Sequence, residues 1–365
     1  MAHAARSSRY NYTTDETRLT PHERVTAQIT SLLERGVRPW IKPWDDIAPS
    51  EALVLPLRSC GTPYRGMNIV ALWAAALECS FKARHWFTFK QALAMNACVR
   101  KGERGSYVVY YTELSDTSGD TARPSIVSKA SNANGAETGE TRRILRGYTV
   151  FNAEQIDGLP EEFYPNPDAD PVPACPCTRS DDDTRLAALF ARIPVKLRHG
   201  GNRAFYSKAA DFIQMPLREA FRDGSQYWAT LAHETAHASR HETRLNRDFG
   251  QTRFGDAGYA LEELVAELAS AFIGATIGLP ADHLEDHASY IEGWLKALSD
   301  SPSAFLTAAS KAQAAADWVL REMGVELSAV SRLNSLVVPT LKSNFEPRLR
   351  EYHHRHPLAR FEWRA

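Results

Sequence analysis

Residues 228–241 read WATLAHETAHASRH and contain two histidines four positions apart. On a helix, residues at this spacing lie on one face at about 5 to 6 Å, so His233 and His237 can direct both imidazoles at one ion. Glu234 then flanks that ion, where its carboxylate can accept a proton from a polarised water. The motif predicts a metal-dependent hydrolase site, and it needs a third protein ligand from elsewhere in the chain.

A second apolar helix is expected at residues 258–279, GYALEELVAELASAFIGATIGL. At about 100° per residue, Glu263 and Glu267 lie together on one border of its apolar stripe, and Glu262 lies well away from that border. Two carboxylates beside a buried face need a cation, because an unpaired buried charge is costly. We assign Glu263 as the third ligand and Glu267 as the acceptor of a histidine Nδ1–H, after the E-x-x-x-D pattern of gluzincin peptidases with Glu in place of Asp. The reverse assignment of the two glutamates stays open.

His241 is a competing third ligand, because it lies four residues beyond His237. The metzincin spacing would instead require a histidine six residues beyond His237, and that position is Thr243. We therefore favour the glutamate helix over His241. A ligand set of two histidines and one carboxylate is typical of a catalytic Zn²⁺ site with one open position.

The segment before the motif helix resembles one side of a peptide cleft. Residues 202–216, NRAFYSKAADFIQMP, read as an edge strand to which an extended substrate can add by backbone hydrogen bonds. Tyr206, His287 and Tyr290 are candidates to donate a hydrogen bond to a tetrahedral oxyanion. A structural role is the stronger expectation for each of these three residues.

Length and composition limit the class of protein. The 365 residues suit two domains, each large enough to bury its own core, and 24% charged with 44% hydrophobic residues is ordinary for a soluble protein. No run of about 18 apolar residues exists to span a bilayer. The first residues lack the apolar stretch of a signal peptide, so we expect a cytoplasmic protein with free cysteine thiols. The middle of the chain is acidic and both ends are mildly basic, which leaves room for a local basic groove in the first third.

Two segments divide the chain. Residues 115–140 are rich in Ser, Thr, Gly, Ala and Asn and interrupt two predicted strands that can pair across them. The stretch rich in Pro and Asp that ends at 183 is the better boundary. We predict an α+β fold of two domains, with a mostly helical second domain that carries a small sheet. The predicted parts are 1–165, a linker at 166–183, a second domain at 184–323 and a tail at 324–365.

Aromatic residues alternate with basic and amide residues in the first domain. Aromatic faces stack on unpaired bases while Lys and Arg follow phosphates, so this mixture suits single-stranded nucleic acid. The same residues suit a core with a basic surface, and composition alone favours that interpretation. The candidate DNA-binding residues are Trp40, Lys42, Trp44, Tyr64, Arg65, Asn68, Trp86, Lys90, Gln91, Arg100 and Lys101.

Several segments together resemble the ArdC-like antirestriction family of conjugative plasmids, whose N-terminal domain also occurs in some plasmid primase-associated proteins. They include LERGVRPWIKPW, TPYRGMNIVALW, TLAHETAHASRHETRLNR and YALEELVAELASAFI, and the resemblance covers most of residues 20–320. It implies a domain that binds single-stranded DNA, then a zincin-like metallopeptidase domain, acting to protect incoming plasmid DNA from host restriction. The family's metal and base positions fall on His233, His237 and Glu234, and less directly on Glu263.

Three functions follow from these observations. The first is a zinc endopeptidase tethered to single-stranded DNA, acting on an unidentified protein or peptide. The second is a DNA-coating antirestriction protein whose metal site is structural. The third is a peptidase that cleaves a repressor of a mobile element. The tail lies beyond the resemblance and is expected to be an unstructured end, with an extra basic contact as the alternative.

Overall fold

The computed structural model describes residues 19–41, 53–114, 142–165, 180–250, 256–279, 288–301 and 303–325. Several predictions lie outside these residues. They concern the excursion at 115–140, most of the linker at 166–183, nearly all of the tail, and the single residues Lys42, Trp44 and His287.

The N-terminal half combines three helices with short and long strands. Its helices are α1 (Pro21–Glu34), α2 (Met67–Cys79) and α3 (Phe89–Ala94). Its strands are β1 (Leu57–Arg58), β2 (His85–Phe87), β3 (Cys98–Val99), β4 (Ser106–Leu114), β5 (Arg142–Asn152) and β6 (Ile156–Asp157). One sheet has the order β1-β2-β5-β4, and β3 pairs with β6 in a second, two-stranded sheet.

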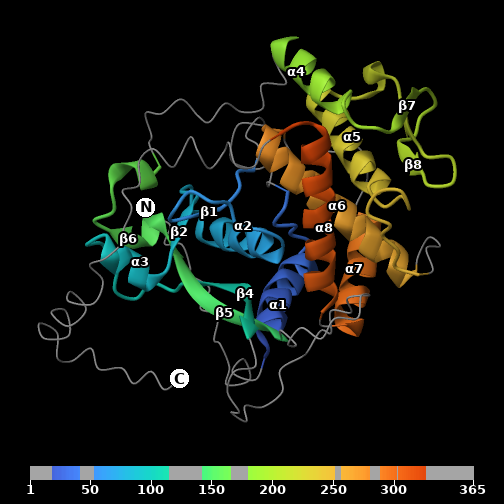
Figure 1. The fold of residues 1–365 in the computed structure, drawn as a ribbon. Coiled ribbons are helices and arrows are strands. Elements are labelled where there is room, and N and C mark those ends of the chain that lie inside the picture. The colour runs from blue at the N-terminus through green and yellow to red at the C-terminus, as the bar shows by residue number, and fades with distance from the viewer. Residues whose placement is uncertain are drawn as a thin grey trace, which may run out of the picture.

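The long strands β4 and β5 form an antiparallel arm at the edge of the larger sheet (Figure 1). This pairing confirms the prediction that the strands on either side of residues 115–140 meet. Gly147 is required in the arm, because a Cβ at this position would lie 2.0 Å from the hydroxyl oxygen of Tyr107. The edge of β4 is covered by Asn68, whose side-chain amide exchanges two 2.8 Å hydrogen bonds with the backbone of Val109. A covered edge cannot template pairing with another chain at this point.

Residues 20–36, TPHERVTAQITSLLERG, begin with a threonine cap and space Val25, Ile29, Leu32 and Leu33 on one helical face, which predicts a helix. The structure confirms this prediction. Thr20 and Glu23 form a capping box at the start of α1, which satisfies backbone N–H groups that a helix leaves open. Val25 and Ile29 lie on the predicted apolar face and are fully buried, together with Leu32 and Leu33.

The C-terminal half places a small sheet beside a group of helices. The sheet contains β7 (Lys196–His199), β8 (Phe205–Ser207) and β9 (Phe212–Met215). The helices are α4 (Ser180–Phe190), α5 (Gly224–Ala238), α6 (Ala257–Ile277), α7 (Ala288–Asp300) and α8 (Ala304–Glu322). The strand order is β7-β9-β8, so the predicted edge strand at 202–216 is in fact two strands, of which β8 forms an edge and β9 the centre. The mixed α+β class is confirmed.

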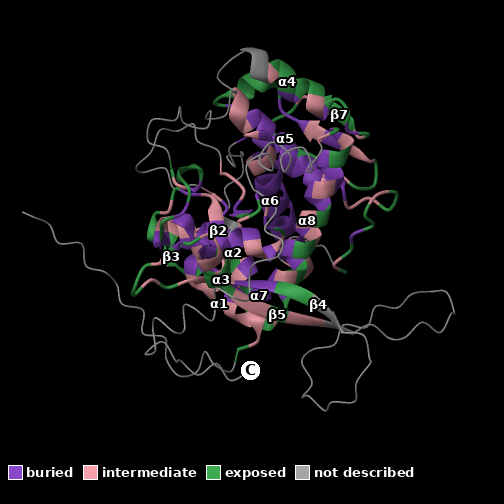
Figure 2. Cartoon of the chain, turned by 60° about the vertical axis from the view of Figure 1, so that its left-hand side comes forward, coloured by how far each residue is buried: buried purple, intermediate pink, exposed green. Residues whose placement is uncertain are grey.

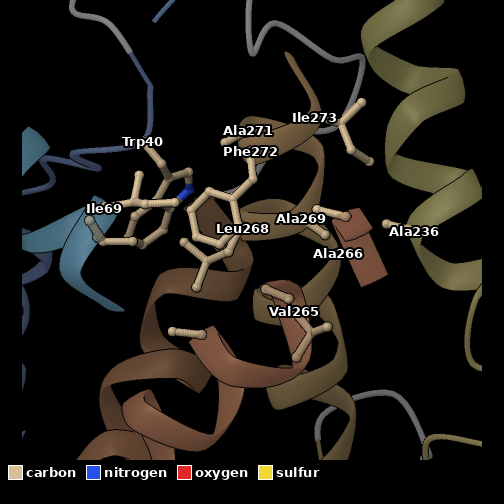
Figure 3. Close-up of a cluster of buried hydrophobic side chains, with 14 of the residues drawn as sticks. Trp40, Ile69, Ala236, Val265, Ala266, Leu268, Ala269, Ala271, Phe272 and Ile273 are labelled. Carbon is tan, nitrogen blue, oxygen red and sulfur yellow. The ribbon is translucent and has the colours of Figure 1, made fainter. Parts of the chain in front are cut away.

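The larger of two hydrophobic clusters spans both halves, and the smaller one lies within the N-terminal half around Phe87 and Ile156. The largest cluster of buried side chains draws on α1 and α2 as well as on α5 to α8. Trp40 contacts Trp294 of α7 and Trp73 contacts Phe272 of α6, each with ring centroids 5.8 Å apart. In the close-up, Trp40 lies against Phe272 and Leu268 (Figure 3). Both α2 and α6 are largely buried (Figure 2), and their apolar side chains belong to the same cluster.

Polar contacts join the same two halves at one place. Arg65 forms an ion pair with Asp317 of α8. The backbone N–H of Gly66 donates to the side chain of Gln313 at 2.8 Å. These bonds fix the start of α2 against α8, so the halves meet through both packing and directed hydrogen bonds.

Replacing Trp73 with alanine tests the shared core. Trp73 is 6% exposed and its indole N–H donates to the carbonyl oxygen of Val54 at 2.8 Å. Trp73→Ala should lower the free energy of unfolding by about 3 to 5 kcal/mol. Calorimetry should show one cooperative transition shifted as a whole, because one core unfolds as one unit. The exposed Tyr111→Ala serves as control. Two separate transitions, of which only one moves, would contradict a shared core.

Candidate metal centre

Helix α5 presents both histidines of the motif on one face. Its N-terminus is capped by the Asp223 side chain, which accepts a 2.9 Å hydrogen bond from the backbone N–H of Gln226. The helix runs to Ala238, so His233 and His237 lie one turn apart within it. Their Nε2 atoms are 3.1 Å apart. The predicted geometry of the motif is therefore present.

Glu263 of α6 completes the group. Its Oε2 lies 3.6 Å from Nε2 of His233 and 3.5 Å from Nε2 of His237. One donor atom from each of these residues lies within 4.8 Å of the other two, and together they can hold a metal ion. Two imidazoles and one carboxylate leave a fourth position for water or substrate in a tetrahedral arrangement.

The electrostatics of the group call for a cation. Burial by itself would raise the pKa of Glu263, but the charge on His237 and hydrogen bonds from both histidines lower it. Burial would lower the pKa of His237, and the charge and hydrogen bonds of Glu263 and Glu262 raise it well above its usual value. The carboxylate therefore stays ionised inside the protein, where a metal ion can take the place of the imidazole protons as its counter-charge.

Glu262 orients His237, which the sequence analysis did not foresee. The Nδ1 atom of His237 lies 3.2 Å from Oε1 of Glu262. An ionised carboxylate only accepts, so Nδ1 carries the proton and Nε2 keeps a lone pair for a metal ion. Glu262 had been placed well away from the site, and that prediction is wrong. The apolar stripe was a poor guide because α6 packs against α5, α7 and α8 and is buried on nearly every side.

Arg247 holds Glu262 in turn. Its guanidinium donates to both carboxylate oxygens of Glu262, at 2.8 and 2.7 Å, and both side chains are 2% exposed. Burial would raise the pKa of Glu262, but the hydrogen bonds from Arg247 and His237 outweigh burial and lower it to about 2. Arg247 also donates to the carbonyl oxygen of Ala236 at 3.0 Å, which ties it to α5. Two buried charged residues, Glu262 and Arg247, therefore hold the ligand histidine His237 in position.

The other predicted residues of this site have different outcomes. Glu234 is 3% exposed, and its charge acts on both ligand histidines. Glu267 is 2% exposed, and its predicted role as acceptor for a histidine stays a prediction. His241 lies beyond the end of α5, with Nδ1 2.8 Å from the hydroxyl of Thr243, and it does not join the ligand group.

Two tyrosines lie beside Glu263. The hydroxyls of Tyr259 and Tyr290 are 3.3 Å apart, and Tyr259 also hydrogen-bonds to Glu263. Burial raises the pKa of Tyr259, and the charge of Glu263 raises it further. Tyr290 was a candidate oxyanion donor, whereas Tyr259 was missed although it precedes Glu263 by one helical turn. Tyr206 instead donates to Asp211 at 2.8 Å.

The aromatic residues predicted to stack on bases are mostly in the core. Trp40, Tyr64 and Trp86 are 0%, 3% and 1% exposed. A buried ring offers no face to a base, so the prediction is wrong for these three. Trp40 packs against Trp294 and Trp86 against Phe81, with ring centroids 5.8 and 5.9 Å apart, and Tyr64 belongs to the same core cluster.

The amide and charged candidates have other partners or face solvent. Asn68 is held by the β4 backbone, and the side chain of Gln91 accepts from the backbone N–H of Thr88 at 2.8 Å in the cap of α3. The exposed charged candidates are Arg65, paired with Asp317, Arg100, paired with Glu103, and the lysines Lys90 and Lys101. DNA binding by these charged residues stays a prediction.

Comparison with known families divides the chain in two. Residues 20–151 match the N-terminal domain of the anti-restriction factor ArdC, and residues 184–311 match a zincin-like metallopeptidase. The second match contains the whole of α5, α6 and α7, and with them the His-His-Glu group. The fold and the site therefore define a zincin-like metallopeptidase domain joined to an ArdC N-terminal domain.

Relatives and solved structures extend this result over nearly the whole chain. Protein y4eC of Sinorhizobium fredii is 39% identical over 313 residues, which are 84% of this chain and 94% of the relative. The ArdC antirestriction protein of plasmid R388 has crystal structures in metal-free and Mn(II)-bound forms, each with a TM-score of 0.64. They are 35% and 34% identical to this chain and cover 83% and 84% of it, and 97% and 98% of their own chains. This chain belongs to the ArdC-like antirestriction family.

A longer relative contains the same arrangement. The DNA primase TraC of Escherichia coli is 36% identical over 308 residues, which are 82% of this chain but 20% of the primase.

Among the described residues, no helix has the length and apolar character needed to cross a membrane.

Removing the acceptor of His237 should weaken metal binding. Glu262→Gln should lower metal affinity by about 10- to 100-fold, because the orientation of a ligand histidine depends on its outer partner. Competition with a chelator measures this affinity. Because Glu262→Gln leaves Arg247 as a buried charge without a carboxylate, the double variant Arg247→Met, Glu262→Gln should recover part of the lost stability but not the metal affinity.

The matched control for this pair is Glu242→Gln, which removes a carboxylate from an exposed position close to α5. It should leave metal affinity unchanged. Wild-type affinity in Glu262→Gln would show that Glu262 does not position His237 for the metal.

Proposed function

We propose that this chain is a zinc-dependent endopeptidase that acts on a protein or peptide next to single-stranded DNA and so protects incoming DNA from restriction. The observation that carries the peptidase half is the convergence of His233, His237 and Glu263, with the carboxylate of Glu234 beside both histidines. When bound, Zn²⁺ supplies Lewis acidity where the three ligands converge.

Three side chains and one strand would take part in peptide hydrolysis. Glu234 accepts a proton from the attacking water and returns it to the leaving amine. Tyr290 donates a hydrogen bond to the developing oxyanion, and Tyr259 holds the Tyr290 hydroxyl in place. Strand β8 offers the backbone groups of a sheet edge to an extended peptide, next to α5.

The DNA half of the proposal rests on the family match at residues 20–151. We infer that residues 1–165 bind single strands without sequence preference, that 166–183 connect them to the peptidase residues 184–323, and that the protein works in the cytoplasm of a cell receiving a conjugative plasmid. The exposed basic side chains of this half would follow the phosphates.

A second function has an observation in its favour. The site is deeply enclosed, since His233 and Glu234 are each 3% exposed. An enclosed metal site also suits a structural role, in which the ion stabilises α5 against α6 and the protein protects DNA by coating it.

Glu234→Gln separates the two functions. Metal content and DNA binding should stay at wild-type level, because a glutamine side chain has nearly the same shape as the glutamate that it replaces. Proteolysis should fall by about a hundredfold or more, since general-base catalysis contributes this much. Mass spectrometry of fragments from host lysate measures cleavage, and conjugation into a restricting host measures protection. Glu242→Gln is the control. Full protection by the inactive variant would contradict peptidase-driven antirestriction and favour coating.

Single-stranded DNA should bind more tightly than duplex of the same sequence. The affinity should fall steeply as salt rises, with a slope of about −0.7 per phosphate contacted on a single strand. Fluorescence anisotropy of labelled oligonucleotides over a salt series gives both quantities. Equal affinity for both forms, or affinity that does not depend on salt, would refute a groove that combines stacking with phosphate contacts.

A further inference from the structure

A row of three tyrosines and two arginines begins on the β4–β5 arm, with Tyr110, Tyr148 and Arg146, and continues to Tyr64 before α2 and Arg58 of β1. The rings of Tyr110 and Tyr148 meet edge to face, with centroids 5.4 Å apart. Burial raises the pKa of Tyr64, and the nearby hydroxyl of Tyr148 raises it further. The guanidinium of Arg58 lies over the ring of Tyr64, 5.4 Å from its centroid. Arg146 is the cross-strand partner of Tyr110. We call these five residues the aromatic–arginine row.

The register of the arm places the row on one face. Residues directly opposite each other in an antiparallel pair point to the same side of the sheet, so Tyr110 and Arg146 share a face. The next pair on that face, two residues along each strand, is Val108 and Tyr148. Tyr111 lies on the other face, because successive side chains of a strand alternate.

Three members of the row, Tyr110, Arg58 and Arg146, are exposed to solvent and available to bind a ligand. Tyr110 is 43% exposed, and Arg58 and Arg146 are exposed. Within the described parts of the chain, neither arginine forms an ion pair. The middle of β4 includes an exposed stretch, which carries Tyr110 (Figure 2). An exposed ring with Arg146 opposite it, in a row that ends at a second exposed arginine, fits a ligand that is both anionic and aromatic.

We propose that the aromatic–arginine row is the surface on which single-stranded DNA stacks. A base lies on the ring of Tyr110, and the guanidinium groups of Arg58 and Arg146 contact the phosphates on either side. Tyr64 and Tyr148 support Tyr110 from the protein side. The proposal rests on the proposed function, and it assigns base stacking to residues other than the buried Trp40 and Trp86.

The chemistry of the row favours nucleic acid over a protein partner. Base–aromatic stacking tolerates any sequence because every base has a π-face, and arginine adds a charge-assisted contact to phosphate. A protein-docking surface of this size would be centred on fully desolvated apolar anchors. The two valines on this face, Val108 and Val150, are fully buried in the core and so do not offer such anchors.

The arm provides a matched pair of variants for the test. Tyr110 and Tyr111 are adjacent, both are exposed, at 43% and 55%, and they lie on opposite faces of the same strand. Tyr110→Ala should weaken binding of a labelled oligothymidylate by about tenfold through the loss of one stacked base. Tyr111→Ala should bind as wild type, and Tyr110→Phe should keep most of the affinity because it keeps the ring.

A charge variant reports on the phosphate contact separately. Arg146→Gln should weaken binding and reduce the salt slope by about 0.7, the value for one phosphate contact on a single strand. Circular dichroism and the melting temperature of each variant should match wild type, since the substituted side chains are exposed.

The outcomes distinguish this inference from the function on which it rests. Failure of the wild-type protein to bind the oligonucleotide would overturn the DNA half of the proposed function. Wild-type binding with equal affinities in Tyr110→Ala and Tyr111→Ala would overturn the row alone. Loss of plasmid protection in Tyr110→Ala with unchanged oligonucleotide affinity would identify the row as a protein-docking surface, and this too would overturn the inference.

Discussion

The metal centre depends on how the buried carboxylates of α6 are compensated. Glu262, Glu263 and Glu267 are 1%, 7% and 2% exposed, and a carboxylate removed from water costs several kcal/mol unless partners replace its hydration. Arg247 and His237 do this for Glu262, whereas Glu263 has the two ligand histidines. A metal ion held by His233, His237 and Glu263 would therefore also neutralise the buried negative charge of Glu263 on α6. Metal binding and the packing of α6 against α5 are thus physically linked.

The same helix joins the site to the N-terminal half. One side of α6 carries Glu263 toward α5, and another side packs Phe272 on Trp73 of α2. Packed interiors of this kind shift between discrete arrangements rather than deforming gradually. Helices α1 and α2 contact the β4–β5 arm directly, so the arm and the metal centre belong to one packed body. A ligand on the arm would affect the metal centre only by shifting this shared packing.

Sequence patterns predicted the elements whose signals are local. The cap and apolar face of α1 and the His233–His237 pair follow from spacing within one helix, and the pairing of β4 with β5 follows from two matched strands. Glu263 lies on a second helix, where the sequence left two glutamates as candidates for the third ligand. Glu262 and Trp40 were misjudged for one shared reason. A helix wheel and a mixture of aromatic and basic residues do not show what packs on each side, and here α5, α7 and α8 enclose α6 while α7 covers Trp40. Long-range packing, which has no local signature, determined both.

The positions of the two proposed binding surfaces limit how they can act together. The β4–β5 arm and the small sheet with β8 lie toward opposite ends of the molecule in both ribbon views (Figures 1 and 2). Single-stranded DNA on the arm would therefore leave the peptide site open. The shared core prevents the two ends of the molecule from folding onto each other. A substrate protein cut at the metal centre would therefore have to reach from one end to the other, or be bound to a neighbouring stretch of the same DNA. DNA binding would then raise the local concentration of proteins bound to nearby DNA, which is a gain in effective concentration without any new contact to the substrate.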